Sequence, residues 1–156
     1  MRTGTEQRVY LDPTALRDGV ERLGLGGYET LIERLRPASS FLVSDVYALQ
    51  QIVYEHHLSG DTDYGYRLSE LVQSVLAEVY PITENDLLIS RWLGEEYPNL
   101  LARERLHLAV MRNHGITTLV TGRHDRYRHL NGIELVSIRT LLSNAAASVK
   151  ETKRSA

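Results

Sequence analysis

The chain has 156 residues, of which 42% are hydrophobic and 24% charged, and its formal net charge is −2. This composition is typical of one globular domain with a sizeable core, and it lacks the general basic character of many nucleic-acid-binding proteins. There is no cysteine, which excludes disulfides, thiolate nucleophiles and thiolate metal sites. The chain has no apolar run long enough for a transmembrane helix, and its polar start lacks a signal peptide, so we expect a cytoplasmic protein.

The first half of the chain predicts alternating strands and helices. In order, these are a strand at 8–12, helices at 14–24 and 27–36, a short strand at 41–43, and helices at 45–58 and 62–79. Asp12 ends the first strand, and Pro13 suits the first turn of the helix that follows it. Ser44 is a favourable N-cap for the helix at 45–58.

The second half continues the pattern. It predicts a short strand at 79–82, helices from Thr83 to about 96 and at 100–113, strands at 117–121 and 133–138, and a closing helix at 139–150. Asn99 is the expected cap of the helix at 100–113. Residues 1–7 and 151–156 are expected to be flexible, which leaves a single domain over 8–150.

Strands separated by helices predict a parallel sheet covered by helices on both faces, a three-layer α/β/α sandwich. Ligands bind such sheets outside the carboxyl ends of the strands. Asp12 lies at one such end. The loop TGRHDRYRHL, residues 121–130, follows a later strand and carries several basic side chains around Asp125.

Three acids are candidates for one site: Asp12, Glu104 and Asp125. Carboxylates gathered at strand ends suit Mg²⁺ or Mn²⁺, which prefer oxygen ligands and can activate water for attack on a phosphate. The spacing also allows a purely structural reading, in which Asp12 caps a helix, Glu104 pairs with a neighbouring arginine and Asp125 makes a turn. The histidines provide no zinc site, because no HxxxH pair occurs.

Four segments resemble the PIN domain family. VYLDPTAL resembles its opening strand and acid, VSDVYALQQIVYEH its acid-bearing helix, YPNLLARERLHLAVMRNHGITTLVT its helix-to-strand segment, and HLNGIELVSI its closing strand. The resemblance covers most of residues 8–138 and is most specific over 97–121. The whole chain looks most like a VapC-type ribonuclease toxin.

The resemblance implies a Mg²⁺- or Mn²⁺-dependent endoribonuclease that cleaves RNA. It also implies a homodimer and an antitoxin protein as partner. Asp12, Glu104, Asp125 and Gln51 would be the catalytic group, with Asp12, Glu104 and Asp125 as metal ligands. The expected contacts to RNA come from the side chains of Thr14, Arg103, Arg123 and Arg126.

The sequence departs from the family at several acidic positions. The second acid falls on Gln51, and the third on Glu104 where the family usually has Asp. The fourth falls on Arg123, or on His124 when counted back from Gly132, with Asp125 nearby. Two functions therefore stay open: an endoribonuclease, or a PIN-like domain with weak or lost catalysis that binds RNA or a protein.

Overall fold

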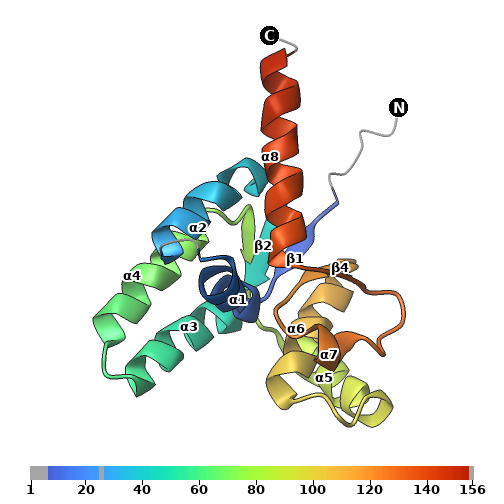
Figure 1. Ribbon diagram of the computed structural model, residues 1–156. Coiled ribbons are helices and arrows are strands. Elements are labelled where there is room, and N and C mark those ends of the chain that lie inside the picture. Colours follow the sequence, from blue (N-terminus) through green and yellow to red (C-terminus); the bar gives the residue numbers. More distant parts are fainter. Residues whose placement is uncertain (1–6, 25–26, 155–156) are drawn as a thin grey trace.

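The computed structural model describes residues 7–24 and 27–154. Its sheet is parallel throughout, in the order β3-β2-β1-β4-β5 (Figure 1). The strands are β1 (Val9–Leu11), β2 (Leu42–Asp45), β3 (Glu78–Tyr80), β4 (Thr118–Val120) and β5 (Glu134–Val136). The helices are α1 (Pro13–Leu23), α2 (Tyr28–Leu35), η1 (Arg36–Ala38), α3 (Val46–Leu58), α4 (Thr62–Gln73), α5 (Glu84–Glu96), α6 (Ala102–Asn113), α7 (His124–Tyr127) and α8 (Ile138–Arg154).

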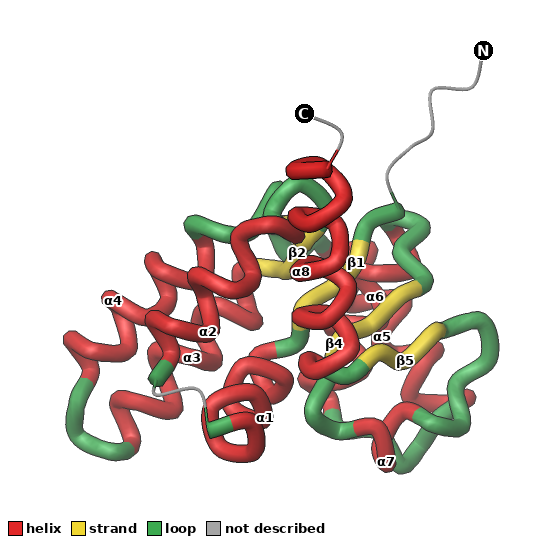
Figure 2. The backbone as a smooth tube through the Cα atoms, turned by 45° about the horizontal axis from the view of Figure 1, so that its top comes forward, coloured by secondary structure: helices red, strands yellow, loops and turns green. Residues whose placement is uncertain are grey.

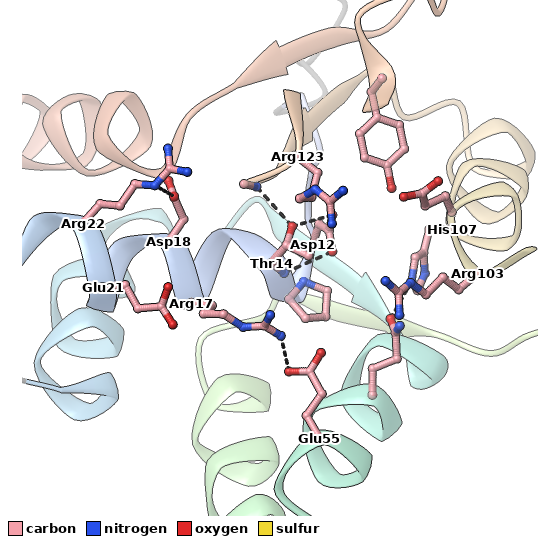
Figure 3. Close-up of a pocket in the computed structure, with 15 residues that line it drawn as sticks. Asp12, Thr14, Arg17, Asp18, Glu21, Arg22, Glu55, Arg103, His107 and Arg123 are labelled. Carbon is pink, nitrogen blue, oxygen red and sulfur yellow. Dashed lines mark hydrogen bonds and ion pairs between the residues drawn. The ribbon is translucent and has the colours of Figure 1, made fainter. Parts of the chain in front are cut away.

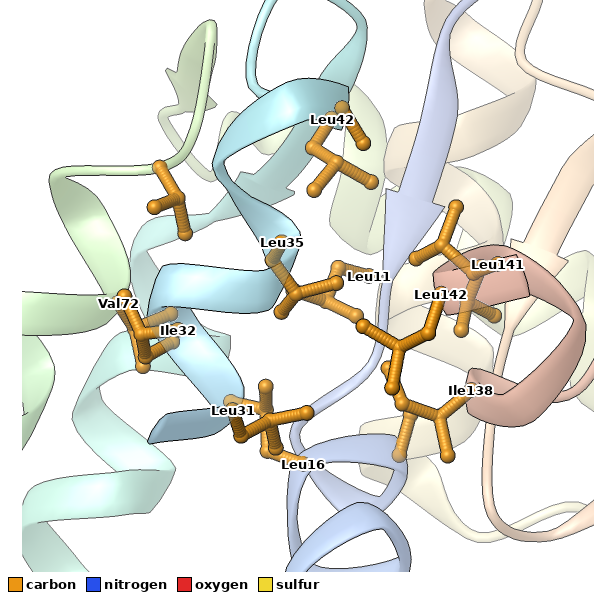
Figure 4. Packing of buried hydrophobic residues seen from close by; sticks show 14 of the residues in the cluster. Leu11, Leu16, Leu31, Ile32, Leu35, Leu42, Val72, Ile138, Leu141 and Leu142 are labelled. Carbon is orange, nitrogen blue, oxygen red and sulfur yellow. The ribbon is translucent and has the colours of Figure 1, made fainter. Parts of the chain in front are cut away.

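Helices cover both faces of the sheet, which confirms the predicted three-layer α/β/α fold (Figures 1 and 2). Successive strand side chains point to opposite faces. Leu11 and Val120 therefore enter one core with side chains of α1, α2, α3, α4 and α8 (Figure 4). Tyr10 and Leu119 enter the other core, with side chains of α5 and α6.

The starts of two helices, α3 and α6, differ from the sequence prediction. Asp45, not Ser44, is the N-cap of α3, because its carboxylate accepts a hydrogen bond from the Ala48 amide. The Ser44 hydroxyl instead donates to the Leu11 carbonyl and so ties β2 to β1. At α6 the N-cap is Leu101, and its amide donates to the Glu104 carboxylate, so the predicted cap at Asn99 is wrong.

The predicted helix at 62–79 ends early, at Gln73. Val75 and Leu76 continue the apolar helical spacing, but their amides make short-range turn bonds to the carbonyls of Val72 and Gln73. Val75 is fully buried in the core, so its apolar character serves packing in the turn before β3. At the other end of the chain, α8 continues to Arg154. No helix within the described residues is long and apolar enough to cross a membrane.

The strand order brings three polar positions to one edge of the sheet. β1 lies between β2 and β4. Asp12 follows β1, Asp45 ends β2, and Thr121 follows β4. Because the strands are parallel, their carboxyl ends meet at the same edge, and the candidate site lies there.

Candidate active site

A cavity of about 190 Å³ opens at this edge (Figure 3). Asp12, Gln51 and Glu104 all line it, although they come from the turn after β1, from α3 and from α6. The other lining residues are Pro13, Thr14, Arg17, Asp18, Glu21, Arg22, Glu55, Arg103, His107, Gly122, Arg123 and Tyr127. The structure thus brings together three of the four residues expected to be catalytic.

The Asp12 carboxylate is held by hydroxyl groups from two segments. It is 5% exposed and is the N-cap of α1, accepting a hydrogen bond from the Thr14 amide at 3.2 Å. The hydroxyls of Thr14 and Thr121 donate to its other oxygen, at 2.9 and 2.8 Å. These bonds fix the orientation of the carboxylate.

Gly122 allows these two segments to come together. A Cβ at this position would lie 2.7 Å from the Thr14 carbonyl oxygen, closer than packed atoms tolerate. The Gly122 amide also donates to the Thr14 hydroxyl at 3.1 Å. The end of β4 can therefore approach the first turn of α1, and Asp12 is enclosed between them.

Glu104 is almost fully buried and pairs with Arg126 from α7. Arg126 Nε donates to one carboxylate oxygen at 3.2 Å, and Arg126 Nη2 donates to the other at 2.9 Å. The second oxygen also accepts from the Leu101 amide at 2.7 Å. Arg126 further donates to the Asn99 carbonyl at 2.6 Å. This pair raises the pKa of Arg126, so its positive charge is permanent.

Behind Gln51 lies a buried polar network. The Tyr10 hydroxyl donates to Asp45 at 2.6 Å, and His107 Nδ1 lies 2.8 Å from the same Asp45 oxygen. His107 Nε2 lies 2.9 Å from Gln51 Oε1. Burial opposes ionisation of Asp45, but the bonds from His107, Tyr10 and Ala48 outweigh it and hold its pKa below the usual range. The network anchors the Gln51 side chain where it lines the cavity.

Most acids at the cavity mouth already have a basic partner. Glu55 pairs with Arg17, and Asp18 pairs with Arg22 at 2.7 Å. Arg103 and Arg123 also line the cavity, and both are exposed. The mouth therefore presents guanidinium groups beside a buried carboxylate, a mixture that suits a phosphate-containing ligand.

Asp125 lies apart from the other candidate acids. Its side chain is 69% exposed, and its carboxylate lies 3.7 Å from the Arg123 guanidinium. It does not line the Asp12 cavity but a neighbouring hollow, which shares Asp18, Arg22 and Gly122 with that cavity. Arg126, an expected RNA contact, does not line the cavity either and is bound to Glu104.

Two side chains of the site escaped the sequence prediction. Asp45 ends β2 as Asp12 follows β1, a repeated pattern that could have marked it. His107 lies three residues after Glu104, so it shares a helix face with an acid that points inward. The pairing of these two residues across the sheet, by contrast, has no signal in the sequence.

The donor groups do not match the metal centre that the resemblance implies. Among the described residues, no three His, Cys, Asp or Glu side chains gather closely enough to hold a metal ion. Gln51 brings no charge, Asp125 lies elsewhere, and both Glu104 oxygens accept from Arg126. A divalent cation would have to displace that guanidinium to reach Glu104.

The chain is similar in sequence to VapC ribonucleases. Over 93 residues it is 30% identical to a VapC ribonuclease of Mycobacterium bovis and equally to ribonuclease VapC13 of Mycobacterium tuberculosis. The match spans 60% of this chain and 71% of each relative. No family model matches the chain.

Solved structures show the same fold. A toxin–antitoxin complex from Klebsiella pneumoniae aligns with a TM-score of 0.57 at 16% identity, over 83% of this chain and 97% of the other. The DNA-bound VapBC of Salmonella typhimurium aligns with a TM-score of 0.63 at 14% identity, over 85% and 98%. Together with the sequence matches, these similarities show that the chain belongs to the VapC family of PIN-domain ribonucleases.

Proposed function

We propose that the chain is a ribonuclease that cleaves RNA phosphodiester bonds at the Asp12 cavity, as the toxin of a VapBC-type pair. The observation that carries the proposal is the convergence of Asp12, Gln51 and Glu104 on one cavity at the carboxyl edge of the sheet. The sequence similarity to VapC ribonucleases supports the same activity.

The proposed roles follow from the surroundings of each side chain. Asp12 has a carboxylate of fixed orientation that can orient a water molecule for attack on phosphorus. Gln51, held by His107, offers an amide that can bind this water or a phosphate oxygen. Arg103 and Arg123 would bind the RNA backbone, because guanidinium groups bind phosphate through paired hydrogen bonds.

Thr14 and Arg126, two of the expected RNA contacts, already bind acids within the protein. The Thr14 hydroxyl donates to Asp12 and accepts from the Gly122 amide, so its proposed contact with RNA would use the remaining lone pair of the hydroxyl oxygen. Arg126 would contact RNA only after leaving Glu104. Asp125 stays a proposed site residue only if the loop around α7 turns inward when RNA binds.

An antitoxin protein is the proposed regulator, because both solved neighbours are toxin–antitoxin complexes. A homodimer is proposed as the assembly. Tyr47, Tyr54 and Tyr66 are exposed on α3 and α4 and supply aromatic surface for these contacts. Size-exclusion chromatography with light scattering tests the dimer directly.

Cleavage of a labelled single-stranded RNA tests the enzyme proposal. The purified chain is assayed in Mg²⁺, in Mn²⁺ and in EDTA, together with the D12N variant and a D63N control from the exposed face of α4. We expect cleavage that requires Asp12, with D63N as active as the wild type. Dependence on Mg²⁺ or Mn²⁺ would mean that the ion displaces Arg126 from Glu104. RNA that stays intact in every buffer contradicts the enzyme proposal.

A second candidate function is RNA binding with weakened cleavage. Two features favour it: Gln51 is neutral, and Glu104 is paired with Arg126. Among the described residues, Asp12 is then the carboxylate of the expected catalytic group that no arginine binds. Fluorescence anisotropy with the same RNA distinguishes the two. Binding that weakens in an R103Q/R123Q double variant, without any cleavage, supports the second function over the first.

A further inference from the structure

The Arg126–Glu104 pair joins the 121–130 loop to the candidate site through two side-chain hydrogen bonds. The side chain of Glu104 is 6% exposed and that of Arg126 is 26% exposed. The guanidinium reaches both carboxylate oxygens and a backbone carbonyl. Arg126 is therefore fixed by three hydrogen bonds rather than loosely placed by charge alone.

The position of this guanidinium matters for cation binding. A carboxylate oxygen that binds Mg²⁺ or Mn²⁺ must approach the ion to about 2.0–2.2 Å, and a fixed guanidinium on the same oxygens prevents this approach. It also repels a second cation at short range, where little water screens the charges. Arg126 therefore disfavours the binding of a divalent ion to Glu104.

We infer that Arg126 is an internal counter-cation that competes with divalent metal ions for Glu104. The structure shows the state in which the chain's own cation is bound. Binding of a metal at the Asp12 cavity requires Arg126 to leave Glu104, so the affinity for metal is lowered by the stability of this pair. The inference deepens the proposed ribonuclease function, but it concerns cation binding and holds whether or not RNA is cleaved.

Isothermal titration of the full chain with Mn²⁺ tests the competition. We expect R126Q to bind Mn²⁺ about tenfold or more tightly than the wild type, because the competing charge is gone. The R126Q/E104Q double variant should lose this gain. R128Q removes an exposed arginine from the same loop and should match the wild type. Equal Mn²⁺ affinity of R126Q and wild type, or a gain that persists in R126Q/E104Q, would overturn the inference.

A second measurement needs no variant and so does not depend on the folding of R126Q. In the wild type, the Arg126 Nε–H resonance reports the hydrogen bond to Glu104. We expect added Mg²⁺ to shift this resonance and to speed the exchange of its proton with water. Both changes should follow the same Mg²⁺ dependence as the chemical shift of the Glu104 carboxyl carbon. A Glu104 signal that responds to Mg²⁺ while Arg126 Nε–H does not would overturn the competition. RNA cleavage is not read in either experiment, so failure here is distinct from failure of the proposed function.

Discussion

At the scale of single residues, aspartates at adjacent strand ends have different surroundings. Asp12 lines the cavity, whereas Asp45 is fully buried and bound by Tyr10 and His107. The sequence predicts that Asp12 lies at the site, because it stands at the end of a strand. The surroundings of Asp45 depend on which strand lies beside β1 and which helix packs against that strand. The sequence also does not predict which way the Asp125 side chain points, because this direction is set by the short helix α7, which turns it outward.

Asp45 makes stability depend on acid pH. Its folded-state pKa lies below the unfolded value of about 3.9, so its contribution is complete above that value and is lost as the pH falls through the folded pKa. When the pH is lowered from about 6 to about 2, we expect the free energy of unfolding to decrease more in the wild type than in D45N. Urea denaturation at each pH measures it, with D63N as the control. Parallel slopes for wild type and D45N would contradict the assignment.

Gly122 carries the second prediction at this scale. An alanine Cβ would meet the Thr14 carbonyl oxygen, which is backbone and cannot yield cheaply. We expect G122A to lower stability by about 1–3 kcal/mol, the usual range for overpacking, and to disturb the hydroxyl bonds to Asp12. Urea denaturation gives the first effect, and RNA cleavage relative to wild type gives the second. A G122A variant with wild-type stability would show that β4 and α1 are less tightly joined than described.

At the scale of elements, apolar periodicity predicted each long helix but not each boundary. The early end of α4 shows why: Val75 is apolar because the turn is buried, and periodicity does not separate a buried turn from a helix. The N-caps at Asp45 and Leu101 depend on which carboxylate accepts a hydrogen bond from a backbone amide in the first turn. In α3 it is the carboxylate of Asp45, and in α6 it is that of Glu104. The close packing of α3 against α4 also requires a residue without a side chain at Gly65. Apolar periodicity does not reveal this requirement.

Gly65 and Gly94 form a matched pair of helical glycines. A Cβ at Gly65 would lie 2.9 Å from the His56 Cβ and 3.1 Å from the Val53 backbone. By contrast, one at Gly94 meets the Arg105 guanidinium, a side-chain end that can shift although it donates to the Leu100 and Pro98 carbonyls. We expect G65A to destabilise the fold by about 1–3 kcal/mol through overpacking. G94A should be neutral or stabilising by up to about 1 kcal/mol, since alanine favours helices. Thermal and urea unfolding compare them, and a stabilising G65A would contradict close α3–α4 packing.

At the scale of the whole molecule, the alternation of strands and helices predicted the three-layer fold. The strand order places β1 between β2 and β4, and this brings Asp12, Gln51 and Glu104 to one cavity. Competition for Glu104 by Arg126 arises from residues 22 positions apart, so it could not be read from local patterns. The strand ends and the helical spacing in the sequence indicated the candidate acids, but not this partner.

The closing helix α8 gives a prediction at this scale. Its buried residues, Ile138, Leu141, Leu142 and Ala145, all lie in its first half, and the second half extends away from the domain (Figure 1). We expect truncation after Ala147 to leave the thermal midpoint within about 2 °C of the full chain. Truncation after Arg139 removes buried leucines and should cost several kcal/mol, about 2–5 for each. Equal stability of the two truncations would show that α8 does not close the core.

The central claim is that the Asp12 cavity is where RNA is cleaved. The most direct test is the ratio of RNA cleavage rates of the wild type and D12N, measured at saturating Mn²⁺ on samples matched for folded content. Loss of a positioned carboxylate at the reacting centre predicts a ratio of about 100 or more. A ratio near one, with both proteins cleaving, would contradict the claim and place the activity elsewhere.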